Sequence, residues 1–196
     1  RAAAGEGSTR LLSAGVSLAS AIMFVRVGVI VAVINACLLG RVLPALMAAT
    51  LTAFGFAALY GRSPGSQSPQ PVTFKNPFEF WSVLGFAVFL GAMIVVSRLI
   101  GEHFGATGAI IGAAVAGLAD VDAISVSMAR LAPQTLAPRI AALAILVAVA
   151  TDTISKIAIG AAIGRGRFAL EIAIMALGSI VVGACALFMT NALLPE

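Results

Sequence analysis

Long apolar stretches alternate with short polar ones along the chain. Six of the apolar stretches reach the length of about 20 residues that a membrane-spanning helix needs. Their residues lack the regular alternation, over segments of about ten residues, that marks a transmembrane barrel strand. Backbone groups that face lipid must be paired internally, as they are in a helix. We therefore predict an all-α integral membrane protein with about six transmembrane helices, at residues 11–39, 42–60, 78–100, 105–131, 140–163 and 168–194.

One connection between these segments is substantial. Residues 61–75 are rich in proline, glycine and serine, which predicts a surface loop. The other connections are short, so the helices are expected to form a single polytopic membrane domain over residues 1–196. The chain begins with Arg1 rather than methionine, and we expect it to be the C-terminal part of a longer protein.

The composition fits a membrane protein with almost no aqueous domain. Hydrophobic residues make up 61% of the chain and charged residues 10%, whereas soluble domains carry about 25% charged residues. The formal net charge is +4, and no basic block with interleaved aromatic residues indicates nucleic acid as a partner. Six basic residues in alternate loops oppose four in the others, which predicts that both termini are cytoplasmic.

A weak internal repeat relates two parts of the chain. Residues 1–10 and 130–139 each begin and end with arginine, and each precedes an apolar helix with a basic residue near its middle. That residue is Arg26 in the first copy and Lys156 in the second. Repeats about a central site are common in transporters. We predict a duplication with two parallel copies, in which a first copy of the helix at 105–131 would precede Arg1.

The stretch GLADVDAIS places two carboxylates inside the fourth apolar segment. On a continuous helix Asp120 and Asp122 would point about 200° apart, because each residue turns the helix by about 100°. A break at 117–122, favoured by Gly117 and the glycines before it, would let both converge. With freed carbonyls and the Ser125 hydroxyl they would offer the hard oxygen ligands that Mg²⁺ and other cations prefer.

The same two carboxylates also allow a purely structural interpretation. One acid would pair with Arg26 or Lys156, and the other would cap the N-terminus of a half-helix. The sequence leaves both interpretations of Asp120 and Asp122 open.

The fifth segment carries a third deep acid. Asp152 and Lys156 are four residues apart in TDTISK and share one face of a helix. Either they neutralise each other, or Asp152 faces a cavity beside Thr151 and Lys156 tunes its charge. Over all the spans, three deep acids meet two deep bases. One acid is therefore left for a cation or a proton.

An enzymatic function is not expected. Asp120 and Asp152 on two spans are similar to the carboxylate pair of an intramembrane aspartyl protease, but the chain reads GLAD where such enzymes carry GxGD. No serine or cysteine is placed with a histidine that would activate it. No cofactor is expected beyond a bound or transported cation such as Mg²⁺. Helix faces rich in small residues favour a homodimer.

Four stretches, SLASAIMFVRVGVIVAV, KNPFEF, GLADVDAISVSMARLA and VATDTISK, together resemble a known membrane domain. It is the C-terminal domain of unknown function 4010, found fused to MgtC/SapB-type N-terminal membrane domains, and the resemblance covers nearly all the chain. It implies a multi-pass protein of a bacterial or archaeal inner membrane, a link to Mg²⁺ homeostasis, and the protein's own N-terminal membrane domain as a partner. The positions that match characteristic charged residues of the family are Arg26, Asp120, Asp122, Asp152 and Lys156.

One of these positions departs from the family pattern. Where this chain has Asp152, the family often has asparagine, which shifts weight to Asp120 and Asp122 as the site.

Two functions are consistent with these patterns. The first is a cation transporter or channel-like domain, Mg²⁺-linked or proton-coupled, with Asp120 and Asp122 as its site and two repeats that move against each other. The alternative is a non-transporting module that assembles with its N-terminal domain or another partner and regulates it. A transporter needs the region of Asp120 and Asp122 to meet water, whereas a structural module buries these acids in a dry, paired state.

Overall fold

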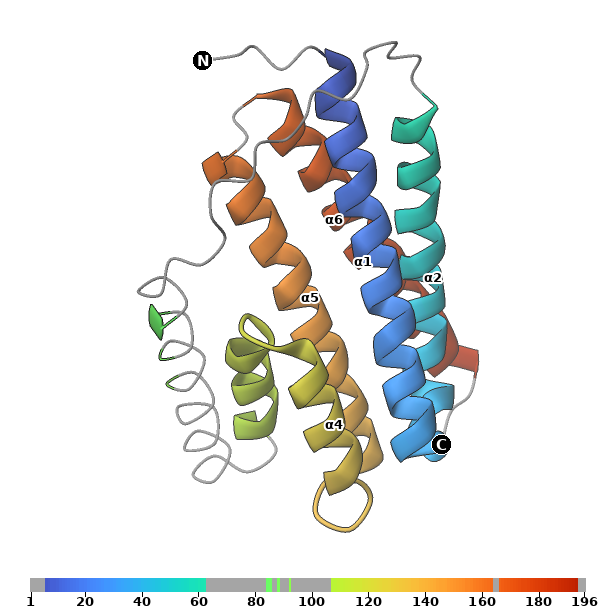
Figure 1. The fold of residues 1–196 in the computed structure, drawn as a ribbon. Helices are drawn as coiled ribbons and strands as arrows, with labels where there is room; N and C mark the ends of the chain where they lie inside the picture. The colour runs from blue at the N-terminus through green and yellow to red at the C-terminus, as the bar shows by residue number, and fades with distance from the viewer. Residues whose placement is uncertain are drawn as a thin grey trace.

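The computed structural model describes residues 6–62, 84–85, 88, 92, 107–163 and 166–193. Within these residues the predicted all-α fold is confirmed. The predicted third span, 78–100, lies outside them except for four helical residues, and so does the loop at 61–75 after its first two residues. The described helices in Figure 1 are α1 (Glu6–Ile34), α2 (Ala36–Gly61), a short helix (Thr107–Gly117), α4 (Val121–Leu131), α5 (Pro138–Ile163) and α6 (Arg167–Leu193).

Four of these helices are long and apolar enough to cross a membrane. Many of their large hydrophobic side chains are exposed, among them Val33, Leu51 and Phe188. Apolar surface of this extent is typical of helices that face lipid. The chain is therefore a membrane protein whose described part has four candidate spans: Thr9–Ile34, Ala36–Gly61, Pro138–Gly160 and Arg167–Thr190.

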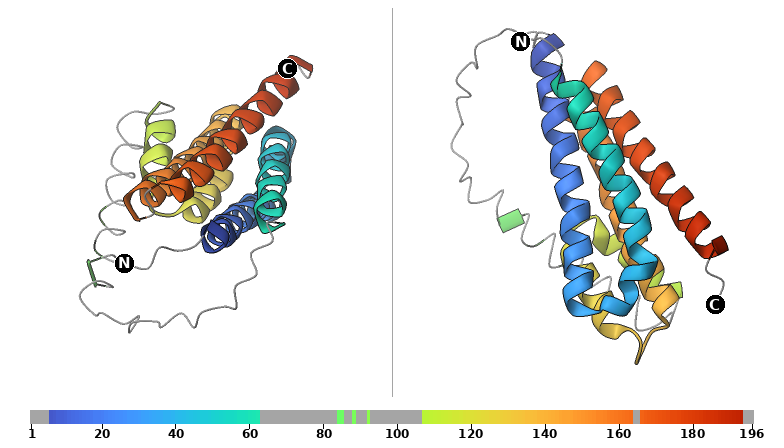
Figure 2. Two further views of the ribbon diagram at one scale, coloured as in Figure 1. Left: turned by 90° about the horizontal axis from the view of Figure 1, so that it is seen from above. Right: turned by 90° about the vertical axis from the view of Figure 1, so that its right-hand side faces the viewer.

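Contacts between distant parts of the chain define the two ends of the bundle. At one end, Arg10 Nε of α1 lies 3.9 Å from Glu171 Oε1 of α6, and the Tyr60 hydroxyl of α2 donates to the Glu171 carbonyl oxygen at 3.2 Å. We call this the Glu171 end. At the opposite end, Asn35 between α1 and α2 contacts the end of α4; we call it the Asn35 end. Helices α1 and α6 run from the Glu171 end to the Asn35 end, and α2 and α5 run back (Figures 1 and 2).

Asn35 ends the first helix within a stretch that is apolar on both sides. The predicted end of the first span, at residue 39, is wrong, because α1 stops at Ile34 and α2 starts at Ala36. The Asn35 amide nitrogen donates to the carbonyl oxygens of Ala129 at 3.2 Å and Ala132 at 2.9 Å. The end of a helix leaves such carbonyls unpaired. A tertiary contact with α4 therefore stabilises the turn.

Replacing Asn35 with aspartate should destabilise the bundle by about 1–3 kcal/mol. The change removes both hydrogen bonds to α4 and sets a carboxylate against two carbonyl oxygens. Thermal unfolding of the detergent-solubilised protein measures the effect. Asn35→Ala, which loses the bonds without adding charge, should fall between the wild type and Asn35→Asp. Equal stability of all three proteins would show that this contact does not hold α4.

The fourth apolar segment does not cross the membrane as one helix. It forms two arms, Thr107–Gly117 and α4, separated by a turn at 118–120. Each arm has 11 residues and is about 16 Å long, roughly half of the ~30 Å hydrocarbon core. Figure 1 shows the arms side by side, with their turn near mid-height of the bundle. The predicted single span at 105–131 is wrong, the predicted break at 117–122 is confirmed, and we call the unit the re-entrant hairpin.

The re-entrant hairpin changes the sidedness of every segment that follows it. The prediction of six spans groups Arg130 and Arg139 with Arg10, but because both ends of the hairpin lie on one side, they lie with Arg41 and the six-against-four grouping is wrong. Since α1 begins and α6 ends at opposite ends of the bundle, the prediction that both termini are cytoplasmic is wrong as well. The described helix ends carry equal numbers of arginines and favour neither orientation. These are Arg10, Arg62 and Arg167 at the Glu171 end, and Arg41, Arg130 and Arg139 at the Asn35 end.

The direction of α5 also bears on the predicted repeat. Since α1 and α5 run in opposite directions (Figure 1), the two copies at 1–10 and 130–139 lead into antiparallel helices and cannot be parallel. The duplication itself stays a prediction, and its copies would be inverted about the membrane plane. Inverted repeats are a recurrent plan in secondary transporters.

Candidate functional site

The turn of the re-entrant hairpin lies against the middle of α5. A Cβ atom added to Gly117 would lie 2.6 Å from the Ala148 Cα, 2.7 Å from the Ala148 carbonyl oxygen and 2.8 Å from Thr151 Oγ1. Only glycine lets the backbone come this close to a neighbouring helix. The contact places the hairpin turn against Thr151, the residue that precedes Asp152 on α5.

Asp120 caps the second arm of the hairpin. Its backbone is extended (φ −157°, ψ 102°), and its Oδ1 accepts hydrogen bonds from the amides of Asp122 at 2.9 Å and Ala123 at 3.2 Å. A carboxylate here also interacts favourably with the positive end of the α4 dipole. The Asp120 side chain is exposed, and no basic side chain in the described part of the chain pairs with it.

Asp122 pairs with Arg26 of α1. The Asp122 Oδ2 lies 2.6 Å from an Arg26 guanidinium nitrogen, and the side chains are 27% and 60% exposed. Asp122 Oδ1 is inaccessible and has no hydrogen-bond partner among the described residues. Arg26 precedes Ile34, the last residue of α1, by eight residues, or about 12 Å. The pair therefore lies well inside the membrane span.

Asp152 and Lys156 form the second ion pair. Asp152 Oδ2 lies 2.7 Å from Lys156 Nζ, and both side chains are about three-quarters buried. Lys156 Nζ also lies 3.2 Å from Met23 Sδ of α1. Met23 precedes Arg26 by three residues, so the two ion pairs contact the same side of α1 about one turn apart. We call these two ion pairs, together with Asp120 two residues before Asp122, the charged cluster; its residues belong to α1, α4, α5 and the hairpin turn.

Two predicted site residues do not extend this cluster. The buried Ser125 hydroxyl donates to the Val121 carbonyl oxygen at 2.8 Å. The Thr151 hydroxyl lies 3.1 Å from the Val147 carbonyl oxygen and 3.0 Å from that of Ala148. Because both hydroxyl protons are used within their own helices, the observed role of these side chains is local.

The predicted metal ligands, Asp120 and Asp122, do not meet a third acidic or metal-binding side chain. Among the described residues no group of three His, Cys, Asp or Glu side chains could hold a metal ion. Asp120 Oδ1 is bound by the α4 amides and Asp122 Oδ2 by Arg26. A cation shared by both acids would have to compete with Arg26, so a metal role for these residues stays a prediction.

The sequence alone indicates no role for Glu171, whose side chain in α6 is only 10% exposed. A lone acid inside an apolar span was the available signal. The contacts of Gly117 and Met23 were also missed. Their partners lie on other helices, so no pattern within their own segments could have shown them.

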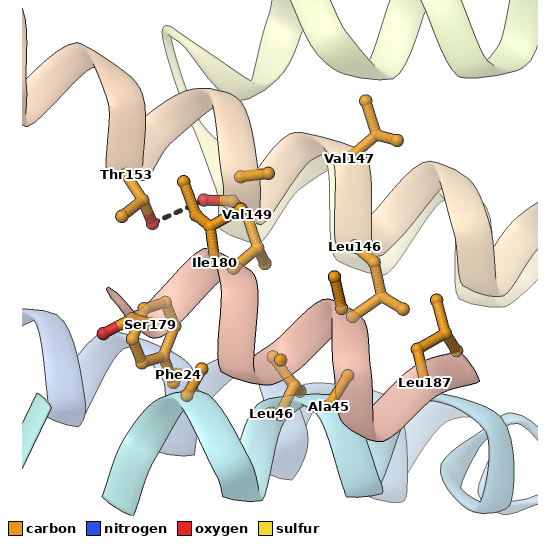
Figure 3. A pocket seen from close by; sticks show the side chains of 14 residues that line it. Phe24, Ala45, Leu46, Leu146, Val147, Val149, Thr153, Ser179, Ile180 and Leu187 are labelled. Atoms are coloured by element: carbon orange, nitrogen blue, oxygen red, sulfur yellow. Dashed lines mark hydrogen bonds between the residues drawn. The ribbon is translucent and has the colours of Figure 1, made fainter. Parts of the chain in front are cut away.

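A separate cavity of about 150 Å³ lies between α2, α5 and α6, next to Phe24 of α1 (Figure 3). Apart from Thr153 and Ser179, its walls are mainly apolar. The Thr153 hydroxyl is turned to its own helix, where it donates to the Val149 carbonyl oxygen at 2.7 Å. Apolar cavities tend to stay dry. The charged cluster is therefore the better candidate for an ion site.

Comparison with known proteins identifies a family. A family model described as domain of unknown function (DUF4010) matches residues 1–164. An uncharacterized protein of Aquifex aeolicus (strain VF5) is 30% identical over 86 residues, which cover 43% of this chain and 37% of the relative. The match thus spans little more than a third of that relative's length. No solved structure matches the chain.

Proposed function

The chain belongs to the DUF4010 family of membrane domains, and on that premise we propose that it translocates cations, with the turn of the re-entrant hairpin as the ion site. The main support is the exposed carboxylate of Asp120 at a helix break near mid-height of the bundle. Non-helical backbone at membrane depth is tolerated only inside protein or beside a water-filled cavity. An exposed charge at such a break favours the water-filled cavity.

Charge balance favours a cation over an anion. The cluster contains three carboxylates, Asp120, Asp122 and Asp152, against the two basic groups of Arg26 and Lys156. One negative charge is left, and it belongs to Asp120. A proton or a monovalent cation would neutralise it. Mg²⁺ usually keeps several of its waters, so it needs few protein ligands at this position.

The proposed cycle uses the Arg26–Asp122 pair as an exchangeable contact. A cation held at Asp120 would compete with Arg26 for the Asp122 carboxylate, whose Oδ1 is otherwise unpaired. The hairpin would then shift on α5 at the close contact of Gly117. Opposed motion of the α1 and α5 units would expose the site to each side in turn, as in transporters built from inverted repeats.

A regulatory membrane module is the second candidate. It is favoured by the direct pairing of Asp122 with Arg26 and of Asp152 with Lys156. Under this proposal a second protein surface covers the exposed side chains of Arg26 and Asp120. The surface would come from the MgtC/SapB-type N-terminal domain or from a second copy of the chain. Either function would be exercised in the inner membrane of a bacterium or archaeon.

Cation flux into liposomes tests the transport proposal. The purified protein should give saturable uptake of at least one of Mg²⁺, Na⁺, K⁺ and H⁺, measured with ion-sensitive dyes in the lumen. Asp120→Asn should abolish that uptake, because it removes the surplus charge while keeping a side-chain oxygen for the α4 cap. Gly15→Ala, at a site with open space around it, should leave the uptake unchanged.

Two results would count against this function. One is the absence of flux for every tested cation in a folded wild-type protein. The other is full flux in Asp120→Asn. The first result, together with stable association of the chain with its N-terminal domain, would favour the regulatory module.

A further inference from the structure

Glu171 lies outside the charged cluster and carries a carboxylate oxygen that the fold does not satisfy. Its side chain is 10% exposed, and Oε2 is inaccessible and has no hydrogen-bond partner among the described residues. The other oxygen, Oε1, lies 3.9 Å from Arg10 Nε, which is too long for a hydrogen bond. Buried polar atoms are nearly always paired, so this oxygen calls for an explanation.

The neighbours of Glu171 do not supply the missing donor to Oε2. The Tyr60 hydroxyl of α2 donates to the Glu171 backbone carbonyl oxygen. Arg10 of α1 approaches the other carboxylate oxygen, Oε1. Arg167 lies one turn before Glu171 on α6, and Oε2 receives no hydrogen bond from it. The amine of Lys156, a basic residue of α5, is bound to Asp152 and to Met23 of α1.

A row of buried serines on α1 begins one turn after Arg10. Ser13, Ser17 and Ser20 are 0–1% exposed. Their hydroxyls donate to the carbonyl oxygens four residues earlier, at 3.1, 2.8 and 3.0 Å respectively. A hydroxyl has one proton to donate and two lone pairs that accept. With its proton used on the helix, each serine offers only acceptor capacity to the interior.

The serine row leads from the Glu171 end towards the charged cluster. Arg10 and Met23 are 13 residues apart on α1, which corresponds to about 20 Å of helix. Met23 contacts Lys156 of the cluster. The row therefore covers much of the distance from the membrane surface to the proposed ion site. The free lone pairs of such a row can accept a hydrogen bond from water or from a protonated carboxyl group.

We propose that Glu171 is the proton-binding residue that couples cation movement to proton movement. This inference rests on the proposed transport function and names its coupling site. In the proposed step the partly exposed carboxylate takes up one proton from water at the Glu171 end, and the proton comes to lie on the buried Oε2. The resulting carboxyl group is neutral and donates a hydrogen bond into the acceptor-lined interior. The proton later returns to water, and no other reactant is needed.

Coupled flux in liposomes tests this assignment. In the wild type an imposed cation gradient should change the pH of the lumen. In Glu171→Gln the same gradient should still drive cation flux, but the pH change should fall to that of protein-free liposomes. An unchanged ratio of protons to cations in Glu171→Gln would overturn the proposal.

A second, conservative change guards against a folding defect in Glu171→Gln. Ser17→Ala removes one acceptor of the row without altering any charge and should slow the proton movement. Thr52→Val is the matched control, because the Thr52 hydroxyl donates to its own helix in the same way at 2.8 Å but is not part of the row. Equal proton movement in Ser17→Ala and Thr52→Val would contradict a role for the row.

Infrared spectroscopy separates this proposal from the transport function. Only a protonated carboxyl group shows the carboxyl C=O stretch. As the pH is lowered, the wild type should develop a component of this band that is missing from Glu171→Gln. If the wild type moves no cation, the transport function fails, and the infrared comparison of the wild type with Glu171→Gln alone decides whether Glu171 binds a proton. A missing component supports proton binding at Glu171, and identical spectra over the folded range overturn it.

Discussion

Asp122→Asn should lower the stability of the protein by about 2.5–3.5 kcal/mol, the cost of a single charge near the membrane centre. The substitution removes the partner that lies 2.6 Å from the guanidinium of Arg26 and leaves that cation unneutralised inside a span. For a chain of this size the loss corresponds to a fall in melting temperature of about 10 °C. Thermal unfolding in detergent, followed by circular dichroism, measures it.

The double variant Arg26→Gln/Asp122→Asn identifies the cause. It removes both charges, so most of the lost stability should return. Asp120→Asn is the matched control. It changes a neighbouring carboxylate that has no basic partner in the described part of the chain, and asparagine caps a helix about as well as aspartate does. A double variant as unstable as Asp122→Asn alone would show that the ion pair is not the origin of the effect.

Gly117→Ala should displace the re-entrant hairpin from α5. The new methyl group would lie within 2.8 Å of the Ala148 backbone and the Thr151 hydroxyl, and the Ala148 backbone cannot move aside without shifting α5. Overpacking of this kind costs about 1–3 kcal/mol. Beyond the loss of stability, cation flux should fall, because the turn that carries Asp120 would no longer be held against α5.

Gly55→Ala provides the control for this change. Gly55 is also helical, but no atom lies within 4 Å of an added Cβ. Alanine is favoured over glycine inside a helix by about 1 kcal/mol, so Gly55→Ala should be neutral or stabilising. Similar behaviour of the two variants would show that the close contact of Gly117 does not position the hairpin.

The apolar character of the chain and its helical class follow from local properties. Whether a segment partitions into lipid depends on the sum of its own side-chain transfer energies, so four of the predicted spans correspond to helices of the structure. The break near Asp120 was also predictable, because glycines and two acids interrupt the apolar run. The count of three deep acids and two deep bases is likewise a property of the sequence.

Three features depended on which helices are neighbours. The turn at Asn35 is stabilised by carbonyl oxygens of α4 nearly a hundred residues away. The choice of Arg26 rather than Lys156 as the partner of Asp122 follows from the packing of α1 beside α4. The fourth segment turns back to the side from which it entered, and this turn depends on the close packing of the Gly117 backbone against α5. Hydrophobicity is the same for a segment that crosses and for one that turns back, because it sums over residues and carries no information on direction; only the packing between helices distinguishes them.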